Sequence, residues 1–210
     1  MLRQGILIVF ALFFFNSVAH AAEEFDEGIE YTVISTPVKT SHPDQVVVTE
    51  MFWYGCPHCF RFEPYLQKWL QTMPQGVVFE QMPSVLNPGW MQHARAFFAL
   101  QAMGETERTH HKIMNAMHLQ NMRLNSVDTL AEFVAGLGVD EKQFREHFHS
   151  FPVDTMVRKS RQKEKKYGHK GVPAVIINGK YLTSASQAGS NARVIEVINF
   201  LVAKELAAKK

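Results

Sequence analysis

Two kinds of hydrophobic pattern alternate along the chain, the short apolar runs of strands and the wider spacing of helices. Residues 45–54 form a run rich in β-branched and aromatic side chains, which predicts a buried strand. Gly55 ends this run, and Pro57 suits the first turn of a helix. Pro64 lies inside that helix, where we expect a kink. The apolar face of the helix consists of Phe62, Leu66, Trp69 and Leu70. Residues 77–82 predict a second strand.

The middle of the chain, residues 88–151, follows a helical period throughout, and we expect an all-helical insert of several short helices. Its apolar positions are Trp90, Ala94, Phe97 and Phe98, then Leu130, Phe133, Val134 and Leu137, then Phe144 and Phe148. A further helix covers roughly residues 106–118. Helices are expected to end at Gly104 and at Gly136 and Gly138, and Asp140 is expected to cap the short helix that carries Phe144 and Phe148.

The last third of the chain predicts a helix, a hairpin and a helix. A basic helix runs from about Asp154 to Tyr167 and ends at Gly168. Residues 174–177 and 180–183 form two strands around Asn178-Gly179, a strong signal for a tight hairpin turn. The final helix buries Val194, Ile195, Ile198, Leu201 and Val202. The order of elements predicts an α/β fold, with a mixed sheet that has helices on both faces. Residues 22–87 and 152–210 would form this domain around the insert.

The first residues have the pattern of a secretory signal. A short basic start is followed by eleven residues without charge, residues 5–15, and then by small residues at Ala19 and Ala21. We expect residues 1–21 to be removed before Ala22, because the apolar run is shorter than the roughly 20 residues that span a bilayer. The mature chain is therefore expected to be soluble outside the cytoplasm.

Composition narrows the function classes further. The 210 residues are 46% hydrophobic and 20% charged, which is typical of a globular protein and not of a disordered one. The net charge of +2 does not suggest a nucleic-acid partner. The basic run from Arg158 to Lys166 is best explained as the solvated face of a helix.

The sequence contains only two cysteines, Cys56 and Cys59, and they lie two residues apart. Exported proteins meet an oxidising environment in which thiols pair. A disulfide between these two would close a very short loop and would stabilise the fold little, so the pair is better explained by chemistry than by structure. Half of a zinc site and an inert disulfide remain minor alternatives. Haem attachment would need a histidine where Phe60 stands.

Cys56 is expected at the start of the helix that follows the first strand. There its sulfur would face unpaired backbone N–H groups at the positive end of the helix dipole, which favours a thiolate. His58 could add positive charge or a hydrogen bond. A stabilised thiolate favours the reduced form of the pair, and the disulfide then becomes a stronger oxidant.

The segment Phe52-Trp53-Tyr54-Gly55-Cys56-Pro57-His58-Cys59 resembles the active site of the DsbA family, periplasmic disulfide donors with a thioredoxin fold. Gly171-Val172-Pro173-Ala174 and the hairpin after it resemble the cis-proline loop of the same family. The similarity covers essentially the whole mature chain, helical insert included. It implies a thioredoxin fold with an inserted helical domain.

The resemblance also implies roles for single residues. Cys56 would be the exposed cysteine that forms the mixed disulfide, Cys59 its buried partner, and Pro57 and His58 the tuning residues between them. A cis peptide at Val172-Pro173 would lie beside the disulfide, and the backbone of Val172 would pair with an extended substrate segment.

Glu50 stands in an otherwise apolar strand, six residues before Cys56. Burial of a carboxylate is costly and raises its pKa. The resemblance implies an acid here that passes a proton to or from Cys59. Family members often pair this acid with a lysine on the next strand, but residues 79–82 read Phe-Glu-Gln-Met and contain no lysine. The proton route is therefore an open question at this point, and a solvated edge position remains the alternative.

The resemblance implies an enzyme that oxidises reduced, unfolded secreted proteins and needs no cofactor or metal. Nothing in the sequence demands more than a monomer. A quinone-linked inner-membrane oxidase of the DsbB type would then restore the Cys56–Cys59 disulfide. A disulfide isomerase or reductase, or a non-catalytic thioredoxin-like chaperone, is the alternative. The histidines of the insert, His110, His111, His118, His147 and His149, are interpreted as structural.

Overall fold

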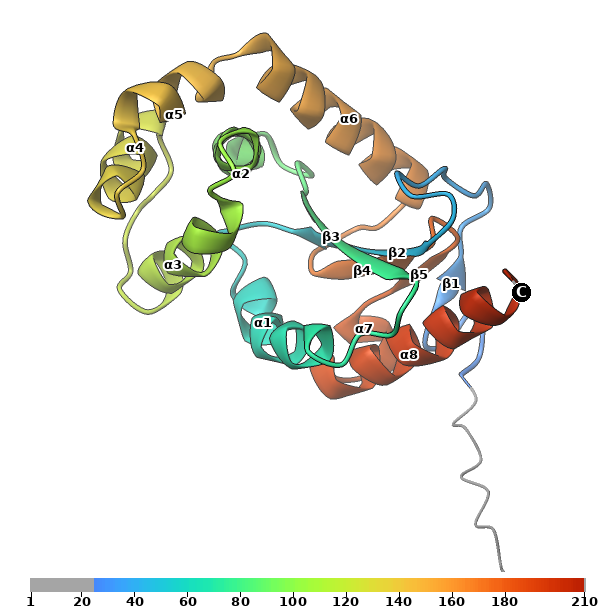
Figure 1. Ribbon diagram of the computed structural model, residues 1–210. Coiled ribbons are helices and arrows are strands. Elements are labelled where there is room, and N and C mark those ends of the chain that lie inside the picture. Colours follow the sequence, from blue (N-terminus) through green and yellow to red (C-terminus); the bar gives the residue numbers. More distant parts are fainter. Residues whose placement is uncertain (1–24, 210) are drawn as a thin grey trace, which may run out of the picture.

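One mixed sheet, with strand order β1-β5-β4-β2-β3, forms the centre of the molecule (Figure 1). The computed structural model describes residues 25–209, so the expected signal at residues 1–21 lies outside the described residues. The strands are β1 (Thr32–Val33), β2 (Val46–Phe52), β3 (Val77–Pro83), β4 (Ala174–Ile177) and β5 (Tyr181–Thr183). β2 runs parallel to β3, and the other neighbouring pairs are antiparallel.

Helices cover both faces of this sheet. On one face lie α1 (Pro57–Leu70), α7 (Ala185–Ala188) and α8 (Asn191–Ala207), while α6 (Phe151–Tyr167) crosses the other (Figure 1). Between β3 and α6 the chain forms the short 3-10 helix η1 (Pro88–Trp90) and the insert helices α2 (Met91–Ala102), α3 (Thr106–His118), α4 (Val127–Gly136) and α5 (Glu141–Phe148). The fold is thus the expected thioredoxin fold with a helical insert.

Strand β2 is buried along its whole length, as its sequence predicts. Successive side chains of a strand point to opposite faces, so Val46, Val48 and Glu50 share one face. Val46 and Val48 pack into the core under α1 and α8, whereas Met51 belongs to the cluster on the α6 face. Glu50 therefore points toward the helix that carries the cysteines.

Helix α1 begins at Cys56, which is its N-cap residue, and Pro57 occupies the first turn. Pro64 lies inside the helix, which continues to Leu70. The buried side of α1 packs against α8, and the Trp69 indole donates a hydrogen bond to Asn199 Oδ1 at 2.8 Å. This packing holds α1 so that its N-terminus lies just beyond the end of β2, next to the insert.

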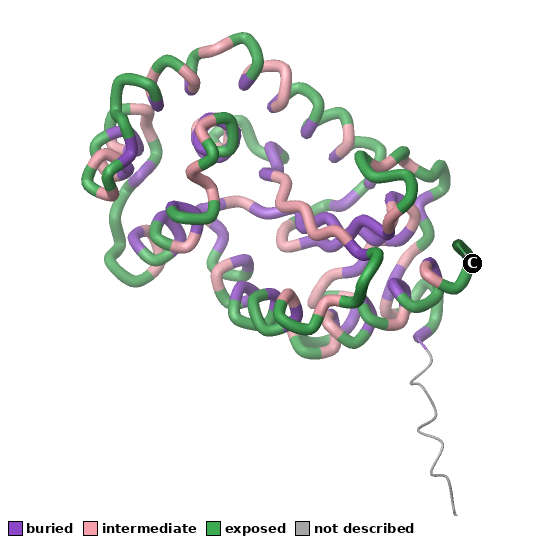
Figure 2. The backbone as a smooth tube through the Cα atoms, in the orientation of Figure 1, coloured by how far each residue is buried: buried purple, intermediate pink, exposed green. Residues whose placement is uncertain are grey.

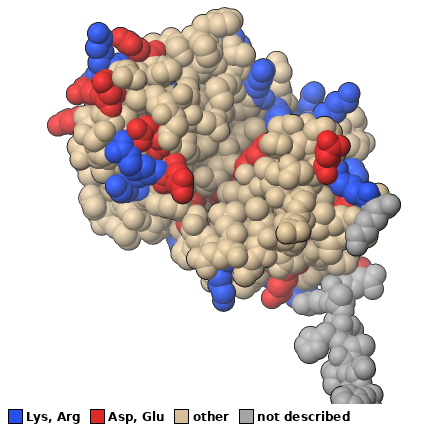
Figure 3. All heavy atoms as spheres, in the orientation of Figure 1, with Lys and Arg blue, Asp and Glu red and all other residues tan. Residues whose placement is uncertain are grey.

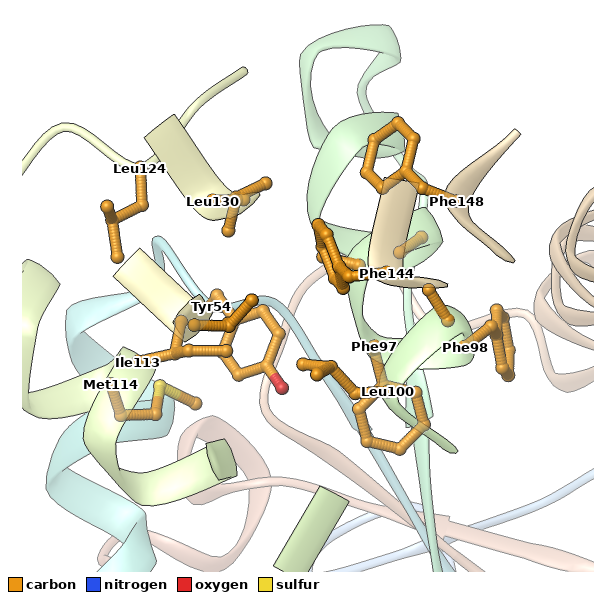
Figure 4. Close-up of a cluster of buried hydrophobic side chains, with 14 of the residues drawn as sticks. Tyr54, Phe97, Phe98, Leu100, Ile113, Met114, Leu124, Leu130, Phe144 and Phe148 are labelled. Atoms are coloured by element: carbon orange, nitrogen blue, oxygen red, sulfur yellow. The ribbon is translucent and has the colours of Figure 1, made fainter. Parts of the chain in front are cut away.

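The insert shares its hydrophobic core with the end of β2. Tyr54 lies among buried side chains of the insert (Figure 4). Phe52 packs edge-to-face against Tyr54 at 5.2 Å and belongs to the same core. Phe97 of α2 contacts Phe52 in the same manner at 5.3 Å. Burial of such large aromatic side chains contributes about 1.5–3 kcal/mol each. The core of the insert thus reaches the cysteine pair, since Cys56 and Cys59 belong to the same cluster.

Several boundaries match the sequence predictions, and others differ for local reasons. The strand at residues 174–177 and the helix at residues 106–118 are confirmed. Helix α6 begins three residues before the predicted Asp154, because Ser150 caps it and Pro152 fits its first turn. β1 and α7 were not predicted; β1 has two residues and α7 has four, too few for a period to appear.

Burial follows the layers: each insert helix and α6 has a buried inner side and an exposed outer side (Figure 2). The basic run on α6 is exposed at most of its lysines and arginines, as predicted for a solvated face. Positive and negative side chains lie in small groups on the face that Figure 3 shows. No helix within residues 25–209 is both long and apolar enough to cross a membrane.

Candidate active site

The two cysteines lie in the first turn of α1 and are present as thiols. The backbone N–H of Cys59 donates a hydrogen bond to Cys56 Sγ at 3.3 Å. Cys59 is fully buried, and Cys56 keeps 6% of its surface accessible. The expectation of an exposed Cys56 is therefore wrong, because both cysteines are buried, although Cys56 is the more accessible of the two.

The environment of Cys56 favours its thiolate. A hydrogen bond from the Cys59 thiol, backbone N–H groups of Cys59 and His58, and the charge of Arg61 together outweigh burial and lower the pKa of Cys56 to about 7. The backbone N–H groups are available because Cys56 is the N-cap residue of α1, where backbone donors are unpaired. A thiol with this pKa is substantially ionised at neutral pH, so Cys56 has the chemistry of a better nucleophile and leaving group than Cys59.

The pKa values of Cys59 and Glu50 are raised, in contrast to that of Cys56. Burial raises the pKa of Cys59 strongly, and the Cys56 thiol and the charge of Glu50 add to the effect. Burial also raises the pKa of Glu50, together with the nearby charge of Glu63, while a hydrogen bond from Gln81 opposes the rise. Glu50 has no accessible surface, and its Oε1 atom has no hydrogen-bond partner. The solvated edge position considered for Glu50 is wrong.

Gln81 stands beside Glu50 on β3, the position at which family members often have a lysine. Gln81 pairs with Glu50 in the β2–β3 register, and its Nε2 donates to Glu50 Oε2 at 3.0 Å. The same amide lies 3.4 Å from Glu63 Oε1 and 3.0 Å from His110 Nε2. The buried acid is thus joined to a polar network and not to an ammonium group.

Glu63 and two histidines complete this network. His110 Nε2 contacts Glu63 Oε1 at 3.1 Å, and His111 Nδ1 contacts Glu63 Oε2 at 3.1 Å. Burial alone would raise the pKa of Glu63, but the contacts with both histidines outweigh it and lower the pKa to about 2. The contact with Glu63 in turn raises the pKa of His111.

Histidines of the insert also hold the loop before the cysteines. His118 Nε2 lies 2.8 Å from the carbonyl oxygen of Tyr54, and His110 Nδ1 lies 3.2 Å from the Tyr54 hydroxyl. The Trp53 indole donates to His93 Nδ1 at 2.7 Å and stacks on Trp90 at 4.5 Å. These contacts hold the segment that precedes Cys56, which is the structural role expected of His110 and His118. His110 also belongs to the buried polar network around Glu50.

The loop at Val172-Pro173 lies beside Cys56, although 116 residues separate Val172 from it in the sequence. The Val172-Pro173 peptide bond is cis, as the resemblance implied. The Cys56 thiol donates a hydrogen bond to the carbonyl oxygen of Val172 at 3.3 Å. This carbonyl is a backbone acceptor placed next to the reacting sulfur.

Pro57 and His58 are both exposed at the start of α1. The His58 ring contacts Arg61 at 3.0 Å through Nδ1. The pKa of Cys56 is lowered most by the hydrogen bond from the Cys59 thiol. The backbone N–H of His58 and the charge of Arg61 add to this effect, and the His58 ring does not. A tuning role of the His58 side chain stays a prediction.

The residues of the site that were missed in the sequence include Glu63, Gln81, His93 and, as members of the network, His110 and His111. Glu63 could have been found, because it stands four residues after Cys59 and therefore on the same inward face of the helix. The others come from β3, α2 and α3, and only the tertiary fold brings them to the cysteines.

Comparisons with known proteins identify the family of the chain. Residues 47–193 match the DSBA-like thioredoxin domain family. The chain is 34% identical over 193 residues to thiol:disulfide interchange protein DsbA of Pseudomonas aeruginosa, which covers 92% of each chain. It is 35% identical over 196 residues to the protein of the same name from Pseudomonas syringae pv. tomato, covering 93% of this chain and 92% of that one.

Solved structures give the same result. The crystal structure of Pseudomonas aeruginosa DsbA superposes with a TM-score of 0.84 at 34% identity, covering 89% of this chain and 97% of that one. The oxidoreductase DsbA of Xylella fastidiosa has a TM-score of 0.80 at 27% identity, covering 85% and 96%. With a cysteine pair at the start of α1 and the cis-proline loop beside it, the chain belongs to the DsbA family of thioredoxin-fold thiol:disulfide oxidoreductases.

Proposed function

We propose that the mature chain works in the periplasm and donates the Cys56–Cys59 disulfide to reduced, unfolded secreted proteins. The observation that carries this direction of electron flow is the asymmetry of the two thiols. The pKa of Cys56 is lowered to about 7, whereas that of Cys59 is strongly raised. A stabilised Cys56 thiolate favours the reduced pair, so the disulfide is a strong oxidant.

The first step forms a mixed disulfide. A substrate thiolate attacks Cys56 Sγ, the Cys56–Cys59 bond breaks, and its electron pair leaves with Cys59 Sγ. The Cys59 thiolate is buried and needs a proton at once, because its pKa is raised. Glu50, whose pKa is also raised, supplies this proton and takes one back when Cys59 loses its proton as the pair is reoxidised.

The second step releases the product. A second substrate thiolate attacks the substrate sulfur of the mixed disulfide, and Cys56 departs as a thiolate. Two electrons have then passed from the two substrate thiols to the cysteine pair. The low pKa of Cys56 makes it a good leaving group in this step.

Substrate recognition would use backbone atoms next to the sulfur. The carbonyl oxygen of Val172 lies 3.3 Å from Cys56 Sγ and can accept a hydrogen bond from an extended chain. Recognition through backbone groups is independent of the substrate's side chains, so we expect broad specificity. The cycle needs no resident cofactor, because a DsbB-type quinone-linked membrane oxidase would reoxidise the pair.

The redox equilibrium of the purified chain tests the direction. The protein is equilibrated with glutathione buffers and the fluorescence of Trp53, stacked on Trp90, reports the state of the pair. Reduction in weakly reducing buffer supports a disulfide donor. A disulfide that survives strongly reducing buffer would instead support a reductase or a structural bridge.

A trapping experiment tests the roles of the two cysteines. Cys59→Ser should accumulate the mixed disulfide with a peptide whose single cysteine carries glutathione in disulfide linkage, because Cys56 displaces glutathione and no second protein thiol releases the peptide. Cys56→Ser should form none. If Cys56→Ser keeps full activity toward unfolded chains, a non-catalytic chaperone is the better account. Fractionation of cells that produce the full chain, against a cytoplasmic marker, tests the periplasmic location and the removal of residues 1–21.

A further inference from the structure

Glu63, His110 and His111 form a compact cluster of possible metal ligands where α1 meets α3. Their nearest ligand atoms all lie within 4.8 Å of one another. The two closest carboxylate–imidazole distances are both 3.1 Å. Two ligands of a tetrahedral zinc ion, each about 2.0–2.1 Å from the metal, are about 3.3 Å apart, so the observed spacing suits a shared ion.

His110 Nε2 has two close neighbours of opposite hydrogen-bonding character. His110 Nε2 lies 3.0 Å from the Gln81 Nε2 donor and 3.1 Å from the Glu63 Oε1 acceptor. A protonated His110 Nε2 would face the amide hydrogens, and an unprotonated one would face the carboxylate. Glu63 Oε2 lies 3.1 Å from His111 Nδ1, but the geometry of this ion pair is not that of a hydrogen bond. Buried acceptors without donors are costly.

A cation could bind both His110 Nε2 and the Glu63 carboxylate. It binds the lone pair of His110 Nε2 and draws the Glu63 oxygens toward itself, while the Gln81 amide still donates to Glu50. The other nitrogen of His110 then donates to the Tyr54 hydroxyl, 3.2 Å away, the kind of outer contact that orients metal-bound histidines. His111 is 45% exposed at its side chain, which gives an ion a path from solvent.

We propose that Glu63, His110 and His111 bind one Zn²⁺ ion. Two imidazoles and one carboxylate are a ligand set that zinc uses with a fourth, open position. Glu63 stands on the helix of the cysteines, one turn after Cys59, and both histidines belong to the insert. The ion therefore ties the insert to the active-site helix. This proposal does not depend on the direction of disulfide exchange.

Calorimetric titration of the tag-free, metal-stripped protein with ZnCl₂ tests the site. The protein is used with the Cys56–Cys59 disulfide formed, so that thiolates cannot bind the ion. We expect one Zn²⁺ per chain and a rise of the thermal unfolding midpoint on addition of zinc. Absence of saturable binding overturns the proposal.

Two variants locate the ion. His111→Ala removes a half-exposed ligand, so the fold should persist, and the affinity should fall at least tenfold, since even outer-shell losses cost about 10–100-fold. His149→Ala is the matched control, because it removes an exposed insert histidine outside the cluster and should bind as the parent does. Unchanged affinity and unchanged thermal shift in His111→Ala would place the ion elsewhere and refute the site.

Discussion

Gln81 Nε2 donates a hydrogen bond to Glu50 Oε2 at 3.0 Å, from the residue directly beside it on the neighbouring parallel strand. An amide in this position leaves the acid without a counter-charge from its strand neighbour. Burial therefore dominates and raises the pKa of Glu50. The acid can hold its proton at a pH where an exposed glutamate has lost it, which suits a donor to the Cys59 thiolate.

Replacement of Glu50 should separate stability from activity. A group whose pKa is raised by folding costs stability above its unfolded pKa, so Glu50→Gln should raise the free energy of unfolding at pH 7 by about 1–3 kcal/mol. The gain should shrink as the pH falls toward 4. Disulfide exchange should slow at the same time. Urea unfolding at both pH values and a peptide oxidation assay measure this, with the exposed Glu196→Gln as control. A variant that is less stable at pH 7 would contradict the argument.

The reactivity of Cys56 should follow its lowered pKa. In the reduced protein, the rate of alkylation by iodoacetamide should rise with pH with a midpoint at about 7. Cys59 should react negligibly, because it is buried and its pKa is raised. A midpoint close to 9, the value of an ordinary cysteine, would show that the helix start does not stabilise the thiolate.

The same shift makes the stability of the reduced protein depend on pH. A pKa lowered by folding stabilises the reduced form above the unfolded pKa, near 9, and this contribution is lost as the pH falls through about 7. Its full size is about 3 kcal/mol, from about 1.4 kcal/mol per pH unit. Unfolding of the reduced protein between pH 6 and 9, with the oxidised protein as reference, measures the effect.

Arg61 should tune Cys56 at a distance. Its charge is the nearby cationic influence on the thiol, so Arg61→Gln should move the alkylation midpoint upward by a few tenths of a pH unit. Both salt and solvent screen an exposed charge, and the difference from the parent should shrink in high salt. Lys68→Gln, an exposed change near the far end of α1, should leave the midpoint in place. Equal shifts in the two variants would point to net charge and not to position.

Gly55 has no room for a side chain. A Cβ atom there would overlap the Trp53 ring, which is held by its stack on Trp90 and its hydrogen bond to His93. Gly55→Ala should destabilise the protein by about 1–3 kcal/mol and change the tryptophan emission. Gly136→Ala, at the end of α4, meets no atom within 4 Å and should be nearly neutral. Parent-like stability of Gly55→Ala would mean that the stack yields easily.

Local patterns were sufficient for the elements that place the cysteines. The apolar run of β2, the break at Gly55 and the proline at position 57 predicted a helix that starts at Cys56. The position of Glu50 under that helix was inferred from family resemblance, because strand alternation alone does not say which face of the sheet α1 covers. Contacts between elements are different, because His110 meets Glu63 across 47 residues and no local period specifies which turn of α3 faces α1. The loop of Val172 beside Cys56 was inferred from family resemblance, not from the chemistry of its residues.

Helix α6 has a consequence for how the molecule unfolds. Its first turn follows the insert, and its second half is hydrogen-bonded to the end of β3 and the residues after it. Ser160 donates to the carbonyl oxygen of Pro83, and Glu164 accepts from the Ser84 hydroxyl and the backbone N–H of Val85. Separation of the insert from the sheet would have to break these bonds or melt the helix. The insert is therefore not an independent folding unit. Sheet and insert should lose their structure in one cooperative transition.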